Sequence, residues 1–187
     1  MVCPSDSGYL DSVIALCREY GVLSIVDEIQ TGLGRTGRLF ACSDCAQAPD
    51  MLLLGKALGG GLMPMSAVVI RPDAWDDRFG ALHSSTFANS NLACSAASAS
   101  IELLMADDGA LIERVAANGQ YFQDELSTLC DRYPDVLSGV RGQGYMRGLV
   151  FRRIFERGDS GSMAFCGLIG VFIGLLSSYL FNIENVL

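Results

Sequence analysis

The chain has 187 residues, a formal net charge of -8 and a hydrophobic content of 50%. This length and apolar content allow one substantial domain or parts of two, which excludes a disordered chain. The acidic balance, in a chain without any Lys- or Arg-rich tract, argues against nucleic acid as a partner.

The first part of the chain predicts alternating helix and strand. Apolar residues recur at helical spacing from 9 to 20, and Gly21 ends this helix. The apolar run 22–26 predicts a buried strand, and the runs 51–54 and 66–70 predict two more. Because these runs are uninterrupted and bounded by Pro, Asp and Gly, we expect strands that are covered on both faces.

The second part predicts two helices and a strand. An Ala- and Ser-rich stretch at 92–105 predicts a tightly packed helix, and a longer amphipathic helix follows and stops at Pro134. The apolar stripe of that second helix consists of Leu111, Val115, Phe122, Leu126 and Leu129. Residues 141–151 then turn through glycines into a strand. We therefore expect one domain over 1–105 and a smaller one over 106–187.

The run at the C-terminal end raises the question of a membrane helix. Residues 160–183 carry no charge and include the apolar segment 163–176, which is long enough to span a bilayer. No Lys or Arg follows the run, and it is interrupted by Gly167, Gly170 and Gly174. These features favour a buried helix of a domain core, with membrane anchoring as the alternative.

The cysteines indicate a reducing compartment. Seven is an odd number for a disulfide framework, and no secretory signal pattern stands at the start. Cys42 and Cys45 form C-x-x-C, but His83 is the only histidine and no second cysteine pair accompanies them. Ordinary loop cysteines are therefore favoured over a structural zinc site or thioredoxin-like chemistry. We expect a cytoplasmic protein without a bound metal.

Three glycines in VDEIQTGLGRTG (26–37) spell G-x-G-x-x-G directly after an apolar run. A dinucleotide-binding fingerprint needs these glycines to open a helix and an acidic residue to close the next strand. The residues after Gly37 have no helical stripe, and Asp50 precedes the strand 51–54 instead of following it. Dinucleotide binding is therefore disfavoured.

A second glycine-rich loop, GKALGGG (55–61), does not match a nucleotide-hydrolysing phosphate loop. That motif requires a Gly five residues before the Gly of the Gly-Lys pair, and a Ser or Thr after the Lys. Asp50 and Ala57 occupy those positions. Nucleotide hydrolysis is therefore not supported.

Lys56 stands out in this loop because the chain contains twelve arginines and a single lysine. A guanidinium is too basic to condense with an aldehyde, whereas a desolvated lysine can form a Schiff base. The apolar neighbours of Lys56 argue against a solvated helix face. Asp27 ends the strand before the first glycine-rich stretch, so both groups are expected at the crevice where open α/β sheets bind ligands. A lysine for an aldehyde and a buried carboxylate for a pyridine nitrogen form the layout of a pyridoxal phosphate site.

The chain resembles the class III, ornithine-type aminotransferases of the fold-type I pyridoxal 5'-phosphate enzymes. The resemblance spans residues 4–151 in family order, and its wording is similar to ornithine, acetylornithine and putrescine aminotransferases. It is carried by SIVDEIQTGLGRTGRLFAC (24–42), PDMLLLGKALGGGLMPMSAVV (49–69), HSSTFANSNLACSAA (83–97) and VRGQGYMRGLVF (140–151). The resemblance implies an α/β fold with part of the large-domain sheet and part of the C-terminal small α+β domain.

The resemblance also implies roles for residues around the cofactor ring. Asp27 would pair with the pyridinium nitrogen, Gln30 would hydrogen-bond the 3-oxygen, and Ile29 would press on one ring face. Lys56 would form the Schiff base and, once freed, move a proton from the substrate carbon to C4' as general base and acid. The implied reaction moves an amino group from an amino acid or ω-amine donor to a 2-oxo acid acceptor.

Further residues would belong to the phosphate site and to the frame. Thr86, with Ser85, would reach the phosphate of the cofactor in the neighbouring subunit, which implies a homodimer with shared active sites. The glycines of 26–37 would turn the chain beside the cofactor and let the backbone approach closely. Glu28 and Arg35 are interpreted as structural or interface residues.

The sequence also departs from the family. Arg147 replaces an apolar residue, and the loop around Thr86 has Ser84, Ala88, Asn89 and Asn91 where the family has Gly or Pro. Nothing corresponds to the upstream loop that cups the phosphate, the aromatic residue that stacks on the ring, or the downstream arginine that binds a substrate carboxylate. We therefore expect weak cofactor binding and little or no turnover, and the alternative is a truncated, inactive aminotransferase-like fragment that acts through exposed apolar surface.

Overall fold

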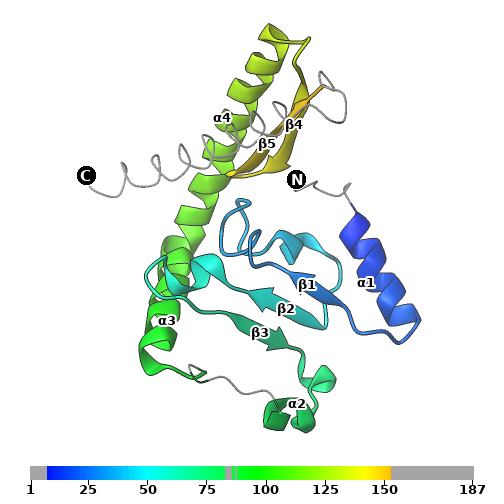
Figure 1. Ribbon diagram of the computed structural model, residues 1–187, viewed down its shortest axis with the longest axis vertical. Coiled ribbons are helices and arrows are strands. Elements are labelled where there is room, and N and C mark those ends of the chain that lie inside the picture. The colour runs from blue at the N-terminus through cyan, green and yellow to red at the C-terminus, as the bar shows by residue number, and fades with distance from the viewer. Residues whose placement is uncertain (1–7, 83–85, 87, 153–187) are drawn as a thin grey trace, which may run out of the picture. The chain divides into compact units, whose positions relative to one another are not determined.

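The computed structural model describes residues 8–82, 86 and 88–152, which form a mixed α/β structure (Figure 1). Its helices are α1 (Tyr9–Glu19), α2 (Asp77–Leu82), α3 (Asn91–Met105) and α4 (Ala110–Arg132). Its strands are β1 (Ile25–Asp27), β2 (Met51–Leu54), β3 (Ala67–Ile70), β4 (Leu137–Gln143) and β5 (Met146–Phe151). Short 3₁₀ helices cover Ala41–Asp44, Lys56–Gly59, Pro72–Ala74 and Ala106–Gly109.

The chain forms two compact units. The first consists of Met1–Glu125 with Arg141–Gly148, and the second of Leu126–Val140 with Leu149–Leu187. The division that the sequence predicts at residue 106 stays a prediction.

Helix α1 confirms the helix expected from 9 to 20. Its apolar residues recur at helical spacing, and this places Ile14 in the core with 1% of its surface exposed. After the helix, Gly21 adopts a φ of 65°, in the left-handed region that glycine enters without a steric penalty. The Val22 N–H then bonds back to the Cys17 carbonyl at 2.8 Å, which closes the helix and turns the chain toward the sheet.

The first sheet has the order β1-β2-β3. Strands β1 and β2 run parallel, with Asp27 opposite Leu53, whereas β3 runs antiparallel to β2. The expectation of strands covered on both faces is wrong for the described part of the chain. Ile25 on β1 is 58% exposed and Val69 on β3 is 53% exposed, because no described element covers these side chains. The strand expected at 22–26 also begins later, at Ile25.

Asp50 fastens the amino ends of β1 and β2 and the end of β3. Its carboxylate accepts hydrogen bonds from the Ser24 backbone N–H at 2.8 Å and from the Ser24 hydroxyl at 2.7 Å. The Asp50 N–H bonds the Ser24 hydroxyl oxygen in return, and the Arg71 guanidinium pairs with the carboxylate at 2.8 Å. Asp50 is 3% exposed, so these bonds compensate the burial of its charge.

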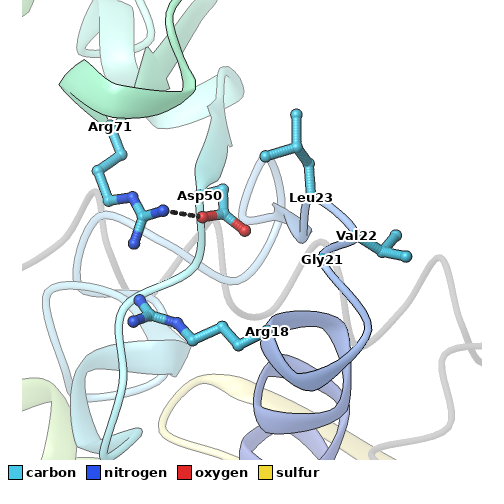
Figure 2. Close-up of a pocket in the computed structure, with 6 residues that line it drawn as sticks. All are labelled: Arg18, Gly21, Val22, Leu23, Asp50 and Arg71. Carbon is cyan, nitrogen blue, oxygen red and sulfur yellow. Dashed lines mark ion pairs between the residues drawn. The ribbon is translucent and has the colours of Figure 1, made fainter.

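A shallow pocket of about 210 Å³ opens beside this clamp, and Figure 2 shows the residues that line it. Arg71 points toward Asp50, and Arg18 extends toward the same region from the end of α1 (Figure 2). Arg18 donates to the Ala48 carbonyl at 3.0 Å. Both arginines therefore already have acceptors, and the pocket belongs to the frame of the sheet.

The core of the first unit lies between the sheet, the loops that follow β1 and β2, and helix α3. Its buried members are Leu33, Leu54, Leu58 and Ala97. Helix α3 follows the expected helix at 92–105 closely, and a Cβ on Gly60 would lie 2.7 Å from the Ser100 hydroxyl. The small side chains of α3 therefore let the loop after β2 approach the helix closely.

The long amphipathic helix expected before Pro134 is confirmed as α4, which buries Val115 and Gly119. A Cβ on Gly119 would lie 2.6 Å from the Gly144 Cα atom, so the turn between β4 and β5 lies directly on the helix. Strand β5 confirms the strand that was expected within 141–151, whereas β4 was not expected from the sequence. Within the described residues, no helix is both long and apolar enough to cross a membrane. The apolar run 163–176 lies outside the described residues.

Arg147, which departs from the pattern that the resemblance implies, has a structural explanation. Its guanidinium donates to the Gly142 carbonyl at 2.7 Å and to the side-chain oxygen of Gln123. Burial lowers the pKa of Arg147, and the nearby Asp124 opposes that shift. The arginine therefore joins β5 to β4 and α4.

Asp50→Asn is expected to lower the free energy of unfolding of the 187-residue chain by about 1–3 kcal/mol at neutral pH, because a buried charged acceptor is removed. The hydrogen bonds from Ser24, assisted by Arg71, hold the pKa of Asp50 below its usual 3.8. A depressed folded-state pKa stabilises the protein above the unfolded value, and this stabilisation is lost as the pH falls through the folded value. In urea titrations, the difference between wild type and variant should therefore shrink at acid pH, below 3.8.

Asp76→Asn is the matched control, because the pKa of Asp76 is also lowered, by hydrogen bonds from Arg78, but the pair is exposed. Solvent screens such a pair, so little change is expected. Equal losses in the two variants would contradict the role assigned to Asp50.

Candidate functional site

The parallel pairing of β1 and β2 brings Asp27 and Lys56 to the same edge of the sheet. Asp27 ends β1 opposite Leu53, and Lys56 follows β2 after a single intervening residue, Gly55. The carboxyl ends of parallel strands are where open α/β sheets bind ligands. The register therefore puts Asp27 at the carboxyl end of one strand and Lys56 just past the carboxyl end of its neighbour.

The carboxylate of Asp27 is held in place by its own turn. Its Oδ1 atom accepts a hydrogen bond from the Ile29 backbone N–H at 2.9 Å. The side chain is exposed, and its Oδ2 atom accepts no hydrogen bond from the described residues. Asp27 thus presents one oriented, free oxygen at the edge of the sheet.

Ile29 connects the end of β1 with the residue before Lys56. A Cβ on Gly55 would lie 3.3 Å from the Ile29 Cγ2 atom, so the isoleucine side chain lies against the Gly55 backbone. Gln30 is exposed in the same turn. Asp27, Ile29 and Gln30, which are predicted to surround a cofactor ring, therefore occupy one short segment. Ile29 of this segment contacts the residue before Lys56.

Lys56 differs from the expectation of a desolvated amine, because its side chain is exposed and makes no ion pair within the described part of the chain. The backbone of Lys56 adopts a φ of 45°, which costs a residue with a Cβ atom about 1–2 kcal/mol. Leu58 and Gly59, which follow it in the 3₁₀ helix, are buried and hold the turn. Strain of this kind often marks a functional position.

The glycines of 26–37 serve close backbone contacts, and no dinucleotide-type helix follows them. A Cβ on Gly32 would lie 2.9 Å from the Glu28 carbonyl oxygen. Gly37 has a φ of 82°, and its Cβ would lie 2.8 Å from the Cα atom of Ala116. The residues after Gly37 form only turns and the 3₁₀ helix Ala41–Asp44. The glycines therefore shape the loop beside Asp27, as expected.

Glu28 is the residue at this site that the sequence did not single out for chemistry. Its side chain is 1% exposed, and its carboxylate accepts from the Cys42 N–H at 2.8 Å and from the Thr31 hydroxyl. Arg35, the other residue interpreted as structural, accepts a hydrogen bond at its carbonyl from the Tyr145 N–H at 3.0 Å. The sequence signal for Glu28 was only its place directly after Asp27.

The C-x-x-C pair has the electrostatics of unreactive thiols. Burial, with the nearby Glu28 carboxylate, raises the pKa of Cys42 to about 12. Burial also raises the pKa of Cys45, with contributions from Asp11 and Asp44. Both thiols therefore stay protonated at neutral pH, which works against thiolate chemistry. Among the residues that the structure describes, no cluster of His, Cys, Asp and Glu could hold a metal ion.

The predicted phosphate residues are only partly within the described residues. Thr86 lies exposed in a turn before α3, and Ser85 lies outside the described residues. The pairing of Thr86 with a phosphate therefore stays a prediction.

Comparisons with known proteins place this geometry in a family. The sequence pattern of the class-III aminotransferases matches residues 1–160. Putrescine aminotransferase of Pectobacterium atrosepticum is 42% identical over 147 residues, which are 78% of this chain and 31% of that relative.

Solved structures agree with this placement. Acetylornithine aminotransferase of Elizabethkingia anophelis superposes with a TM-score of 0.71 at 35% identity, over 84% of this chain and 38% of that one. Ornithine aminotransferase of Toxoplasma gondii gives 0.72 at 39% identity, over 79% and 35%. These neighbours are aminotransferases, and the mixed α/β fold of this chain superposes on part of them. The chain belongs to the class III aminotransferase family, and it spans about a third of the length of these relatives.

We expect the free energy of unfolding of Lys56→Gly to be about 1 kcal/mol higher than that of Lys56→Ala. Glycine adopts the left-handed conformation of this position without a penalty, whereas Ala retains the penalty. Both variants lose the amine, so the comparison isolates the backbone. Urea unfolding of the 187-residue chain measures the difference.

Ala57→Gly is the control, since Ala57 lies in the same 3₁₀ helix at a φ that is not positive. This substitution should destabilise the chain by about 0.5–1 kcal/mol through the added freedom of the unfolded chain. Equal stability of Lys56→Gly and Lys56→Ala would show that position 56 carries no backbone strain.

Proposed function

We propose that this chain carries part of the active site of a pyridoxal 5'-phosphate-dependent aminotransferase. The proposed reaction moves an amino group from an amino acid or ω-amine to a 2-oxo acid. The observation that carries the proposal is that Asp27 and Lys56 stand at the carboxyl ends of two paired parallel strands, with Ile29 lying against Gly55 beside Lys56. The named relatives act on putrescine, acetylornithine and ornithine. We therefore favour an amine or basic amino acid as the donor.

The residues present fit the cofactor at its aldehyde and ring-nitrogen ends. When bound, pyridoxal phosphate supplies an aldehyde that condenses with amines and a ring that withdraws electrons from the neighbouring carbon. Asp27, with Oδ2 open, would hold the protonated ring nitrogen, and Lys56 would bind the aldehyde carbon. Ile29 would press on one face of the ring, and Gln30 would donate to its 3-oxygen.

Lys56 would also perform the proton transfer. Its Nζ atom would remove the proton from the substrate carbon that bears nitrogen. The same Nζ would deliver a proton to C4' of the cofactor. Because Lys56 follows a strand and begins a turn with a buried base, its backbone stays in place while the side chain moves.

The proposal extends to the assembly and its location. Thr86, with Ser85, would bind the cofactor phosphate of a neighbouring subunit, so the enzyme would be a homodimer with shared active sites. The described cysteines are free thiols, and they are Cys17, Cys42, Cys45, Cys94 and Cys130. Free thiols suit the reducing cytoplasm, which is where we place the protein.

Lys56→Ala is expected to abolish the visible absorption band that the wild-type chain acquires with pyridoxal 5'-phosphate, because Lys56 is the only side-chain amine. Borohydride reduction followed by peptide mass analysis should place the cofactor on the peptide that contains Lys56. Lys56→Arg is the matched control, since it keeps the positive charge and cannot condense with an aldehyde.

A visible band that persists in Lys56→Ala, or a reduced cofactor found only on the N-terminal amine, would remove Lys56 from the mechanism. A band in Lys56→Arg would do the same.

Asp27→Asn is expected to weaken cofactor binding about 10- to 100-fold, because a hydrogen bond to a charged group contributes about 1.5–3 kcal/mol. Equilibrium dialysis measures this affinity. Asp44→Asn removes the same charge from an exposed ion pair with Arg38 and should leave affinity unchanged. A similar loss in both variants would indicate a general charge effect and would contradict a specific contact from Asp27.

A second candidate function is supported by the bare apolar side chains of β1 and β3. Ile25, Val68 and Val69 are 58%, 45% and 53% exposed. A chain of this kind could act through protein interactions without turnover. In the same dialysis experiment, a folded wild-type chain that takes up no cofactor would favour this candidate.

A further inference from the structure

Glu28 is a buried carboxylate that pairs with no cation among the residues that the structure describes. Its side chain is among the largest fully buried ones, at 1% exposure, and no ion pair reaches it from the described residues. Burial of a charge is costly unless hydrogen bonds compensate for it. Glu28 has two such bonds, one on each carboxylate oxygen: Oε1 accepts from the Cys42 N–H at 2.8 Å, and Oε2 accepts from the Thr31 hydroxyl.

These bonds join segments that are separate in the sequence. Cys42 lies in the 3₁₀ helix Ala41–Asp44, fourteen residues after Glu28, and Thr31 lies in the turn that follows β1. The backbone of Glu28 adds two more bonds, from its N–H to the Leu53 carbonyl at 3.0 Å and to its carbonyl from the Gly32 N–H at 3.0 Å. Glu28 therefore fixes the turn to β2 at one end and to the following loop at the other.

The residues enclosed by this clamp are the ones that would touch the cofactor. Ile29 donates its N–H to Asp27 Oδ1 and lays its side chain against Gly55, the residue before Lys56. The turn closes tightly on Glu28, since a Cβ on Gly32 would lie 2.9 Å from the Glu28 carbonyl oxygen. Any rotation of this turn would carry the Ile29 N–H away from Asp27.

We propose that Glu28 is a positioning residue of the cofactor site. Its buried carboxylate, held by Thr31 and Cys42, fixes the turn so that the Ile29 N–H aligns the Asp27 carboxylate and the Ile29 side chain stays beside Lys56. The inference rests on the proposed function, and it assigns Glu28 a role beyond filling the core. A residue that only filled space there could be apolar, whereas this one places a carboxylate where no cation of the described residues pairs with it.

The test compares three variants of the 187-residue chain with pyridoxal 5'-phosphate as the probe. Glu28→Gln keeps the shape and removes the charge, and Thr31→Val removes one donor while Glu28 stays. Thr36→Val is the matched control, because its hydroxyl lies in the same loop, is buried and has no hydrogen-bond partner in the described part of the chain. The readouts are cofactor affinity corrected for the folded fraction, the position of the visible band, and amide hydrogen exchange at Ile29 and Cys42 without cofactor.

Glu28→Gln and Thr31→Val are expected to weaken cofactor affinity about tenfold, the cost of one hydrogen bond to a charged group. They should also shift the visible band and speed exchange of the Ile29 N–H, while Thr36→Val should change none of these. A Glu28→Gln variant that loses only stability, with affinity and band equal to those of Thr36→Val, would overturn the positioning role.

The failure of the proposed function gives a different pattern. In that case the wild-type chain and Lys56→Ala would bind the cofactor equally, or not at all. Hydrogen exchange without cofactor then still tests whether the hydrogen bonds of Glu28 hold the turn, because this measurement needs no ligand. Unchanged exchange at Ile29 in both Glu28→Gln and Thr31→Val would overturn it, and faster exchange would support it.

Discussion

The carboxylate of Asp50 is the interaction on which the arrangement of the sheet depends. It accepts hydrogen bonds from the Ser24 N–H and hydroxyl before β1, and it pairs with Arg71 after β3. Asp50 itself directly precedes β2. One buried side chain thus sets where three strands start or end. Because side chains alternate along a strand, a slip of one residue between β1 and β2 would turn the Asp27 side chain to the opposite face of the sheet. The contacts of Asp50 at the amino ends of β1 and β2 therefore determine which groups lie at the carboxyl ends of these strands.

At these carboxyl ends, irregular backbone takes over from the sheet. Lys56 is held at a φ of 45°, and the turn after Asp27 is closed by Glu28 and Gly32. Loops can hold such conformations only when the elements beneath them are firm. Leu54 and Leu58 belong to the core below the loop after β2, and Ile29 lies between the two loops. The core, the strained Lys56 and the oriented carboxylate of Asp27 are therefore connected. A change in the packing of the core would shift the positions of both groups.

The sequence was informative where a single period dominates. The apolar spacing of α1 and α4 and the Ala- and Ser-rich composition of α3 located these helices, and the run at 51–54 matched β2. Strand β4 escaped notice because Gly139 and Gly142, at φ values of 159° and 114°, interrupt its apolar pattern. The coverage of β1 and β3 was misjudged. An apolar run indicates that a strand can be buried, but it does not indicate whether another segment covers that strand. Asp27 and Lys56 could be singled out from residue type and place, whereas the bond between Glu28 and the Cys42 N–H spans fourteen residues of irregular loop and leaves no local pattern.

A ligand held by both Asp27 and Lys56 would do at the carboxyl edge what Asp50 does at the amino edge. It would cross-link β1 to the loop after β2, in a chain whose strands expose Ile25 and Val69 and so gain less from burial than a fully covered sheet. A ligand that binds only the folded state adds about 2.7 kcal/mol at a concentration one hundred times its dissociation constant. For a domain of marginal stability this is a large contribution. Cofactor binding is therefore expected to be coupled to the ordering of the loops after β1 and β2. In this equilibrium, the hydrogen bonds of Glu28 would lower the free-energy cost of ordering the loop after β1 when the cofactor binds.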